Sequence, residues 1–208
     1  MIAARLSILM LATSVALQAA QAAPGWTDAG TKGAVTLAFR DVPQLNAREV
    51  RAVAELPHAP GQIIPVVCDF TQPLDPDTRE ARILSGDLGG RYEIYLRYAP
   101  RFLVVSARDV VLDIQPQANG CAWSEVEGRL PPQSGAVRMP LLRGSWTVEP
   151  IDGARSRVTY QIAVRPGGSI PGWMVRRGAV SALPEVIRRV AGCLASPERR
   201  AGRCPSAP

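Results

Sequence analysis

GSWTVEPIDGARSRVTYQIAVRPGGSIPGWMV, residues 144–175, followed directly by RRGAVSALPEVIRRVAGC, residues 176–193, is the stretch that decides the fold. Its first part holds two short β-rich segments, 144–150 and 157–165, with an Asp-Gly pair between them. Such segments predict two strands joined by a turn. The second part has helical periodicity. The stretch therefore predicts a strand pair that leads into a long C-terminal helix.

The helix follows from the spacing of its apolar residues. They recur every three or four positions and are Val175, Ala179, Leu183, Ile187, Ala191 and Leu194. This spacing places them on one face, and most arginines of the segment lie off that face. Pro184 is expected to bend or loosen the helix, because its ring meets the carbonyl group of Val180.

Further β-rich segments precede this stretch. They span residues 35–39, 50–56, 79–84, 92–98, 109–115 and 122–128. Residues 59–70 predict a short helix, with Pro60 in its first turn and Pro65 distorting it. No helical segment between these strands is long enough to form a crossover connection, so we expect an antiparallel sheet. A single helix along such a sheet either grips a ligand or completes an ordinary core.

The N-terminus has the pattern of an export signal. Residues 1–5 hold one positive charge, residues 6–17 are almost entirely apolar, and Ala20 and Ala22 are small residues at the positions that a signal peptidase reads. A retained membrane anchor is the alternative, but a membrane span needs about 20 apolar residues. We expect a signal peptide over residues 1–22 and a single exported domain over 23–208, in the periplasm or outside the cell.

The charge pattern argues against nucleic acid. The formal net charge is +6, and Lys32 is the only lysine. A basic surplus suits anionic lipid headgroups or nucleic acid, but these arginines are scattered along the chain. We expect a monomer that touches a membrane surface transiently and has no nucleic-acid partner.

Four cysteines in an exported chain predict disulfides. Cys193 and Cys204 lie close together, across the end of the last helix and a short tail, and are expected to pin that tail. That pairing leaves Cys68 with Cys121. Three connectivities are possible, and the sequence does not choose among them. Neither a CxxC motif nor Cys/His spacing typical of metal sites occurs, so we expect no metal and no cofactor.

Three motifs in a fixed order resemble a known family. SARDVV (106–111) follows an aromatic-rich strand, a Pro-Gly-Gly turn and Ile-Pro-x-Trp follow the last strand, and a helix with a central proline comes last. Together they resemble the START domains, the family of lipid-transfer domains related to the steroidogenic acute regulatory protein, and most closely the phosphatidylcholine-transfer branch. The resemblance covers residues 35–193 and is strongest in the last third.

The resemblance implies an α+β fold of the helix-grip type. A curved antiparallel sheet would wrap around the C-terminal helix and enclose a hydrophobic cavity for one lipid, with the domain core at about residues 35–194. In the phosphatidylcholine-transfer branch the arginine of an Arg-Asp motif faces the lipid headgroup. Arg108 and Asp109 match that motif, and a guanidinium binds phosphate through two parallel hydrogen bonds. The alternative role is a structural ion pair. The next strand lacks a further basic residue found in some relatives, which leaves the headgroup open.

The resemblance also implies a gate, formed by the loop 130–141 and the start of the last helix. This loop is rich in proline and glycine, a composition that resists regular structure. Trp173 and Met174 are expected where helix and loop meet, and they suit contact with a membrane surface. Further expected cavity residues, which equally suit an ordinary core, are Trp123, Trp146, Tyr160 and Leu183.

The function implied is the enclosure of one lipid or other hydrophobic molecule and its transfer between membranes. A helix-grip enzyme, of cyclase or hydrolase type, is the first alternative. It would need a general base, and His58 is the only histidine, in a turn bounded by prolines. No nucleophile elbow or phosphate loop occurs, so we expect no catalysis. An envelope interaction module with a filled core is the third possibility.

Overall fold

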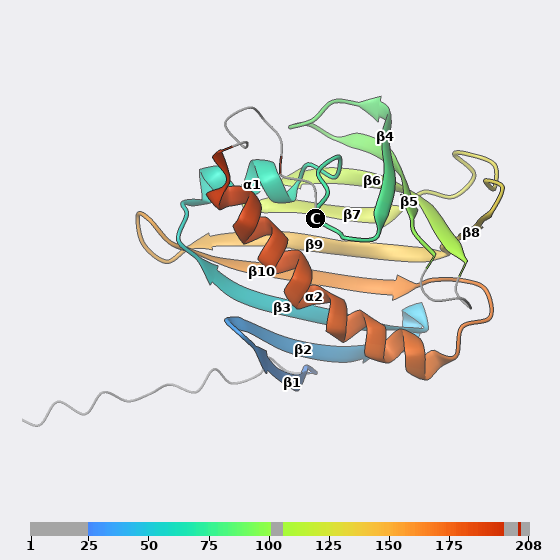
Figure 1. Cartoon of the computed structure of the whole chain (residues 1–208), viewed down its shortest axis with the longest axis horizontal. Coiled ribbons are helices and arrows are strands. Elements are labelled where there is room, and N and C mark those ends of the chain that lie inside the picture. Colours follow the sequence, from blue (N-terminus) through green and yellow to red (C-terminus); the bar gives the residue numbers. More distant parts are fainter. Residues whose placement is uncertain (1–24, 101–105, 198–203, 205–208) are drawn as a thin grey trace, which may run out of the picture.

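One curved sheet and one long helix make up most of the structure (Figure 1). The computed structural model describes residues 25–100, 106–197 and 204, without the side chains of residues 176, 177 and 179. The predicted signal peptide, residues 1–22, lies outside this range. The helix is α2 (Gly172–Ala195), and a shorter helix, α1 (Pro60–Val67), lies near its C-terminal end. None of the helices in the described ranges combines the length and apolar character needed to cross a bilayer.

The strands follow each other around the sheet in the order β1-β2-β3-β10-β9-β7-β6-β5-β4. They are β1 (Thr27–Lys32), β2 (Val35–Val42), β3 (Ala47–Leu56), β4 (Thr78–Gly86), β5 (Tyr92–Tyr98), β6 (Ala107–Gln117), β7 (Gly120–Glu125), β8 (Ala136–Arg138), β9 (Leu141–Pro150) and β10 (Ser156–Arg165). All pairs are antiparallel except β6 with β8. The predicted helix-grip fold is confirmed.

Three local predictions need correction. β1 was not predicted, and β8 lies inside the loop 130–141 and pairs in parallel with β6. The first helix ends at Val67 rather than at residue 70. It stops there because the Asp69 carboxylate accepts hydrogen bonds from the backbone N–H and the hydroxyl of Thr71, a local pairing that competes with helical hydrogen bonds.

The central strands β3, β10 and β9 present one apolar face to α2. Val158 of β10 lies opposite Ala54 of β3 and Val148 of β9, and all three side chains are buried. Alternation along a strand then sends every second residue to the same face. The opposite face carries charged residues, among them Glu49 of β3, which forms an ion pair with Arg40 of the neighbouring strand β2.

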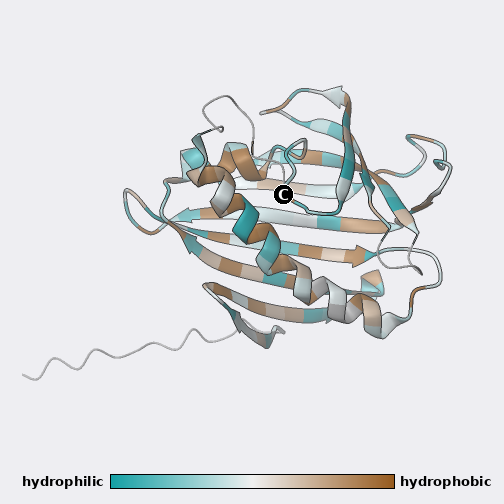
Figure 2. Cartoon of the chain, viewed as in Figure 1, coloured by the Kyte–Doolittle hydropathy of each residue, from teal (hydrophilic) through white to brown (hydrophobic). Residues whose placement is uncertain are grey.

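The helix α2 crosses the concave face of the sheet with an apolar stripe (Figures 1 and 2). The stripe is buried at Leu183, Val186, Ile187, Val190 and Leu194. Glu185 and Arg188 form an ion pair on the helix surface, away from the stripe. Pro184 does not end the helix, which continues to Ala195.

Two disulfides are present, Cys68 with Cys121 and Cys193 with Cys204. The predicted pairing is therefore confirmed. The first links the end of α1 to β7, and the second links the last turn of α2 to the tail. The backbone N–H of Cys204 donates to Oε1 of Gln72 at 2.8 Å. Both disulfides thus help to hold the segment that follows α1, the first directly and the second through Cys204.

Gly144 on β9 leaves room for a tryptophan on the neighbouring strand. A Cβ atom at this position would lie 2.6 Å from Cζ2 of Trp123 and would also overlap the carbonyl oxygen of Gln161. Trp123 lies directly opposite Gly144 in the register of β7 and β9. A glycine is therefore required for the indole to lie against the sheet.

We expect Gly144→Ala to lower the free energy of unfolding by about 1–3 kcal/mol, because overpacking forces neighbouring groups apart. Urea unfolding followed by tryptophan fluorescence measures this change. Gly153→Ala is the matched control, since a Cβ at that exposed position would meet no atom within 4 Å. Equal stability of the two variants would contradict the packing described for Trp123.

Candidate functional site

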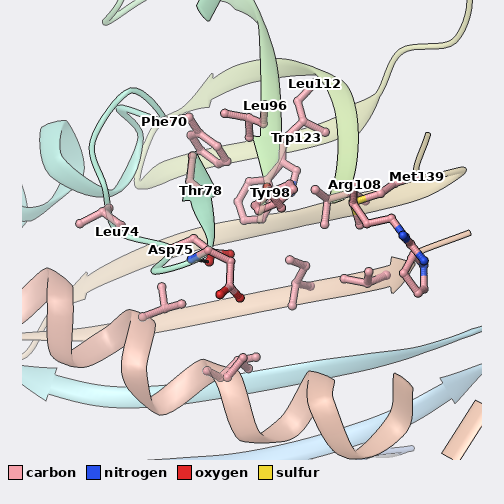
Figure 3. Close-up of a pocket in the computed structure, with 18 of the residues that line it drawn as sticks. Phe70, Leu74, Asp75, Thr78, Leu96, Tyr98, Arg108, Leu112, Trp123 and Met139 are labelled. Atoms are coloured by element: carbon pink, nitrogen blue, oxygen red, sulfur yellow. Dashed lines mark hydrogen bonds between the residues drawn. The ribbon is translucent and has the colours of Figure 1, made fainter. Parts of the chain in front are cut away.

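A cavity of about 330 Å³ lies between α2 and the concave face of the sheet (Figure 3). Its walls come from the segment after α1, from β5, β6, β7, β9 and β10, and from α2. The apolar and aromatic side chains that line it include Phe70, Leu74, Leu96, Leu112, Trp123, Met139, Leu142, Trp146, Tyr160, Met174, Leu183 and Val186. Such a concave, mostly apolar space with a few polar groups is typical of a ligand pocket.

Four aromatic rings form one wall of the cavity. The rings of Trp146 and Tyr160 stack with centroids 4.2 Å apart, because the two residues lie directly opposite each other on β9 and β10. Trp123 stacks on Tyr160 at 5.9 Å, and Phe70 meets Trp123 edge to face at 5.0 Å. The rings pack against one another in sequence and form an apolar wall.

Two phenol groups in the cavity stay neutral. Burial raises the pKa of Tyr98 and of Tyr160 far above that of an exposed tyrosine, and the Asp75 carboxylate raises both further. Asp75 points into the cavity from the segment before β4 (Figure 3). Asp77 lines the same side. This flank of the cavity therefore holds hydroxyl groups and carboxylates.

Arg108 enters the cavity from the start of β6, beside Met139 (Figure 3). Only 7% of the residue is exposed. Its guanidinium donates hydrogen bonds to the carbonyl oxygens of Ser106 at 2.7 Å and of Ala107 and Gly167 at 3.3 Å, while Nε has no partner. Burial lowers its pKa, and no carboxylate within the described part of the chain pairs with it. Arg108 is thus a buried cation surrounded by neutral acceptors.

The turn before α2 packs closely against this arginine. Gly167 and Gly168 both have positive φ angles, 71° and 65°. A Cβ on Gly168 would lie 3.3 Å from a terminal nitrogen of Arg108, and one on Gly167 would lie 2.8 Å from the carbonyl oxygen of Arg138. The Pro-Gly-Gly sequence thus brings a backbone carbonyl group to the guanidinium and links the turn to β8.

Asp109 points to the opposite face of the sheet from Arg108, as neighbours on a strand must. It is fully buried and accepts two hydrogen bonds from Arg138, at 2.9 and 3.1 Å. Arg138 also donates to the carbonyl oxygens of Leu130 and Pro131. Asp109 therefore fastens the loop 130–141 to the outer face of β6.

Several solved structures with this architecture are START-type lipid-transfer domains. A STAR-related lipid transfer protein from Xanthomonas axonopodis is 27% identical in sequence and superposes with a TM-score of 0.72, over 83% of this chain and 99% of that one. The chain has the START fold. The predicted resemblance is therefore confirmed, and the START fold supports a lipid-binding role for the cavity.

Two human START domains share the fold at lower identity. StAR-related lipid transfer protein 5 is 14% identical with a TM-score of 0.73, over 82% of this chain and 86% of that one. STARD10 is 18% identical with a TM-score of 0.74, over 88% of this chain and 78% of that one. These structures do not single out the phosphatidylcholine-transfer branch, so that assignment stays a prediction.

Sequence comparison adds less. No family model matches the chain. An uncharacterized protein of Pseudomonas aeruginosa is 34% identical over 83 residues, which are 38% of this chain. The match spans only 41% of that relative's length.

The START cavity contains most, but not all, of the residues predicted for it. Arg108 and the predicted late-strand and helix residues line it, namely Trp123, Trp146, Tyr160, Met174 and Leu183. Two predicted residues do not. Asp109 faces away and pairs with Arg138, and Trp173 is 61% exposed at the start of α2. The structural ion pair considered for the Arg-Asp motif thus involves only its aspartate.

Sequence reasoning missed several lining residues of the START cavity. They include Phe70, Asp75, Leu96, Tyr98, Leu112 and Met139. One signal was available, because Leu112 lies four residues after Arg108 on the same strand and therefore on the same face. Asp75 and Met139 come from irregular segments, where no periodicity indicates a direction.

We expect Asp109→Asn to destabilise the START domain by about 3–5 kcal/mol, because removing one partner of a buried ion pair leaves the other charge uncompensated. Thermal and urea unfolding measure the loss. Asp152→Asn is the control, since Asp152 pairs with Arg155 on the surface and its loss should change stability little. A stable Asp109→Asn variant would show that Arg138 does not depend on this carboxylate.

Proposed function

We propose that the protein is an extracytoplasmic carrier that encloses one lipid, or a similar hydrophobic molecule, and passes it between membranes. The observation that carries this proposal is the apolar cavity between α2 and the sheet, with Arg108 buried inside it. A filled core would need neither the space nor the charge. The names of the solved relatives, which are lipid-transfer proteins, support the same function.

Arg108 supplies the anchor for an acidic headgroup in this proposal. A guanidinium offers paired donors that match phosphate or carboxylate. Here it has lost most of its hydration, and the acceptors that the described residues offer it are neutral. An anionic ligand would therefore neutralise a charge that no carboxylate in the described part of the chain compensates. The likeness to the phosphatidylcholine-transfer branch rests on this arginine and on residues 144–193.

Export fits such a carrier. The signal-type sequence over residues 1–22 and the two disulfides support an oxidising compartment such as the periplasm. An acyl chain gains about 0.8 kcal/mol for each methylene group that leaves water, so a lipid crosses an aqueous gap poorly unless it is enclosed. Trp173 is exposed next to the cavity residue Met174 and suits a transient contact with a membrane surface.

The polar groups in and near the cavity favour binding rather than catalysis. Tyr98 and Tyr160 hold their protons because burial raises their pKa, so neither is a ready base near neutral pH. His58 stands at the turn before α1, and its carbonyl oxygen accepts a hydrogen bond from Ser156. It does not belong to the cavity lining.

The direct test is mass spectrometry of ligands extracted from protein purified from its native envelope fraction. We expect one lipid or hydrophobic molecule per chain, and a mature N-terminus at Ala23. Protein that carries no hydrophobic ligand, and takes up none from vesicles, would favour the interaction-module alternative. Turnover of the extracted molecule would favour the enzyme.

We expect Arg108→Ala to weaken the binding of an anionic lipid by about ten- to a hundredfold, since a charge-assisted hydrogen bond contributes about 1.5–3 kcal/mol. Equilibrium binding measures the effect. Arg157→Ala is the control, because it removes the same charge from an exposed side chain that pairs with Glu55.

Arg108→Met separates binding from folding. Methionine keeps much of the length without the charge, and it removes a desolvated cation that pairs with no carboxylate in the described ranges. We expect the free energy of unfolding to stay nearly unchanged while anion binding falls. If Arg108→Met unfolds at room temperature, Arg108 has a structural role instead.

A further inference from the structure

We infer that a disulfide-held latch at the C-terminus keeps one wall of the cavity closed and slows the release of a bound molecule. The wall is the strap, defined as residues 69–77 between α1 and β4. The latch is the link from Cys193 through Cys204 to Gln72. This inference rests on the proposed function and adds to it how the bound molecule is retained.

The strap forms a wall of the cavity that lies away from Arg108. It contains no helix or strand, and most of its side chains line the cavity. Figure 3 shows Phe70, Leu74 and Asp75 of the strap on one side of the cavity and Arg108 on the other. Leu74 is buried, and Phe70 packs edge to face on Trp123. Lifting the strap would therefore open the cavity to water at a place remote from the arginine.

The sheet holds both ends of the strap. Just before it, Cys68 is bonded to Cys121 of β7, and its carbonyl oxygen accepts a hydrogen bond from the Tyr92 hydroxyl at 2.6 Å. At the other end, the carbonyl oxygen of Asp77 accepts from the backbone N–H of Ala99 at 2.7 Å. These contacts do not involve α2. The closure of the strap against the helix therefore depends on what holds its middle.

Hydrogen bonds join the middle of the strap to α2 and to the tail. The backbone N–H of Cys204 donates to Oε1 of Gln72 at 2.8 Å, and the disulfide fixes Cys204 to Cys193 in the last turn of α2. Arg189 donates to the carbonyl oxygen of Pro73 at 3.3 Å. Cys193 is buried in the core. The latch thus ties the strap to the part of the helix that is packed on the sheet.

The latch is complete only in the oxidised protein. The bond forms by exchange with a disulfide-bearing oxidant, in which Cys193 and Cys204 lose two electrons and two protons and the oxidant is reduced to two thiols. Without this bond no cross-link holds Cys204 beside the strap, and its hydrogen bond to Gln72 must compete with water. Retention of the bound molecule should therefore increase when this disulfide forms.

Lipid release tests the latch. The mature, oxidised protein is loaded with pyrene-labelled phosphatidylglycerol from phosphatidylglycerol vesicles, and release into unlabelled vesicles is followed by pyrene fluorescence. We expect the double variant Cys193→Ser/Cys204→Ser, which keeps the other disulfide, to release the lipid at least about fivefold faster, the effect of losing one net hydrogen bond. Release at the wild-type rate from the folded variant would overturn the inference and leave the proposed function standing. If no form takes up the lipid, both fail.

Two arginines on α2 give a matched comparison that leaves both disulfides intact. Both pair with Glu185, but of the two Arg189 alone reaches the strap in the described structure. Arg189→Ala should speed release by about twofold or more, because it removes the hydrogen bond to Pro73. Arg188→Ala should release the lipid at the wild-type rate. If the double serine variant does not fold, this pair decides, and equal release rates would overturn the inference.

Hydrogen exchange measures the opening of the strap without any lipid. The backbone N–H groups of Gln72 and Leu74 donate to carbonyl oxygens within the strap. At labelling times too short for β3 and β10 to exchange, we expect peptides that cover residues 69–77 to exchange at least about fivefold faster in the double serine variant. Strap peptides that exchange as in the wild type would contradict the latch.

Discussion

A single helix cannot fill the concave face of a wide sheet, and the rest of this structure depends on that mismatch. A helix with its side chains is about 10–12 Å across, whereas nine strands spaced about 4.8 Å apart form a surface several times wider. Curvature brings β5 and β6 over toward α2 but leaves a space that side chains do not close (Figure 1). Protein interiors are otherwise close-packed, so a space of this size marks where a second molecule fits.

Two adjacent charged residues on β6 have different roles because neighbouring side chains on a strand point to opposite faces of the sheet. Arg108 and Asp109 are neighbours on β6, and their side chains go to opposite faces of the sheet. The arginine enters the apolar cavity, where none of the described carboxylates pairs with it, whereas the aspartate is neutralised by Arg138 and holds the loop 130–141 in place. The turn at Gly167 lies next to Arg108 and to Arg138, since its carbonyl oxygen accepts from Arg108 and a Cβ added to it would lie 2.8 Å from the carbonyl oxygen of Arg138. The cavity charge and the loop are therefore parts of one packed unit.

The sequence predicted the elements with strong periodicity and missed those set by distant partners. The apolar stripe of α2 and the strands around residues 92–98 and 157–165 were predicted from spacing alone. The disulfides agree with the expected pairing, which was one of three that the sequence left possible. β8 has three residues among prolines and forms because β6 is beside it, so no local pattern indicates it. In the same way, the placement of Asp109 required its partner Arg138, and Asp75 required the path of an irregular segment. Cavity size depends on all walls at once, so it had to come from the structure.

The central pairing of β3 with β10 also determines how late in synthesis the sheet and its cavity can form. Their paired residues, from Ser156 with Leu56 to Ala163 with Glu49, lie about a hundred positions apart in the chain. Sheets that depend on such distant contacts fold slowly. Until β10 has been made, β3 has an open edge and its apolar face lacks the covering helix, a state that favours aggregation. The cavity thus comes into existence only with the last quarter of the chain, and the unfinished protein depends on whatever shields that edge in the meantime.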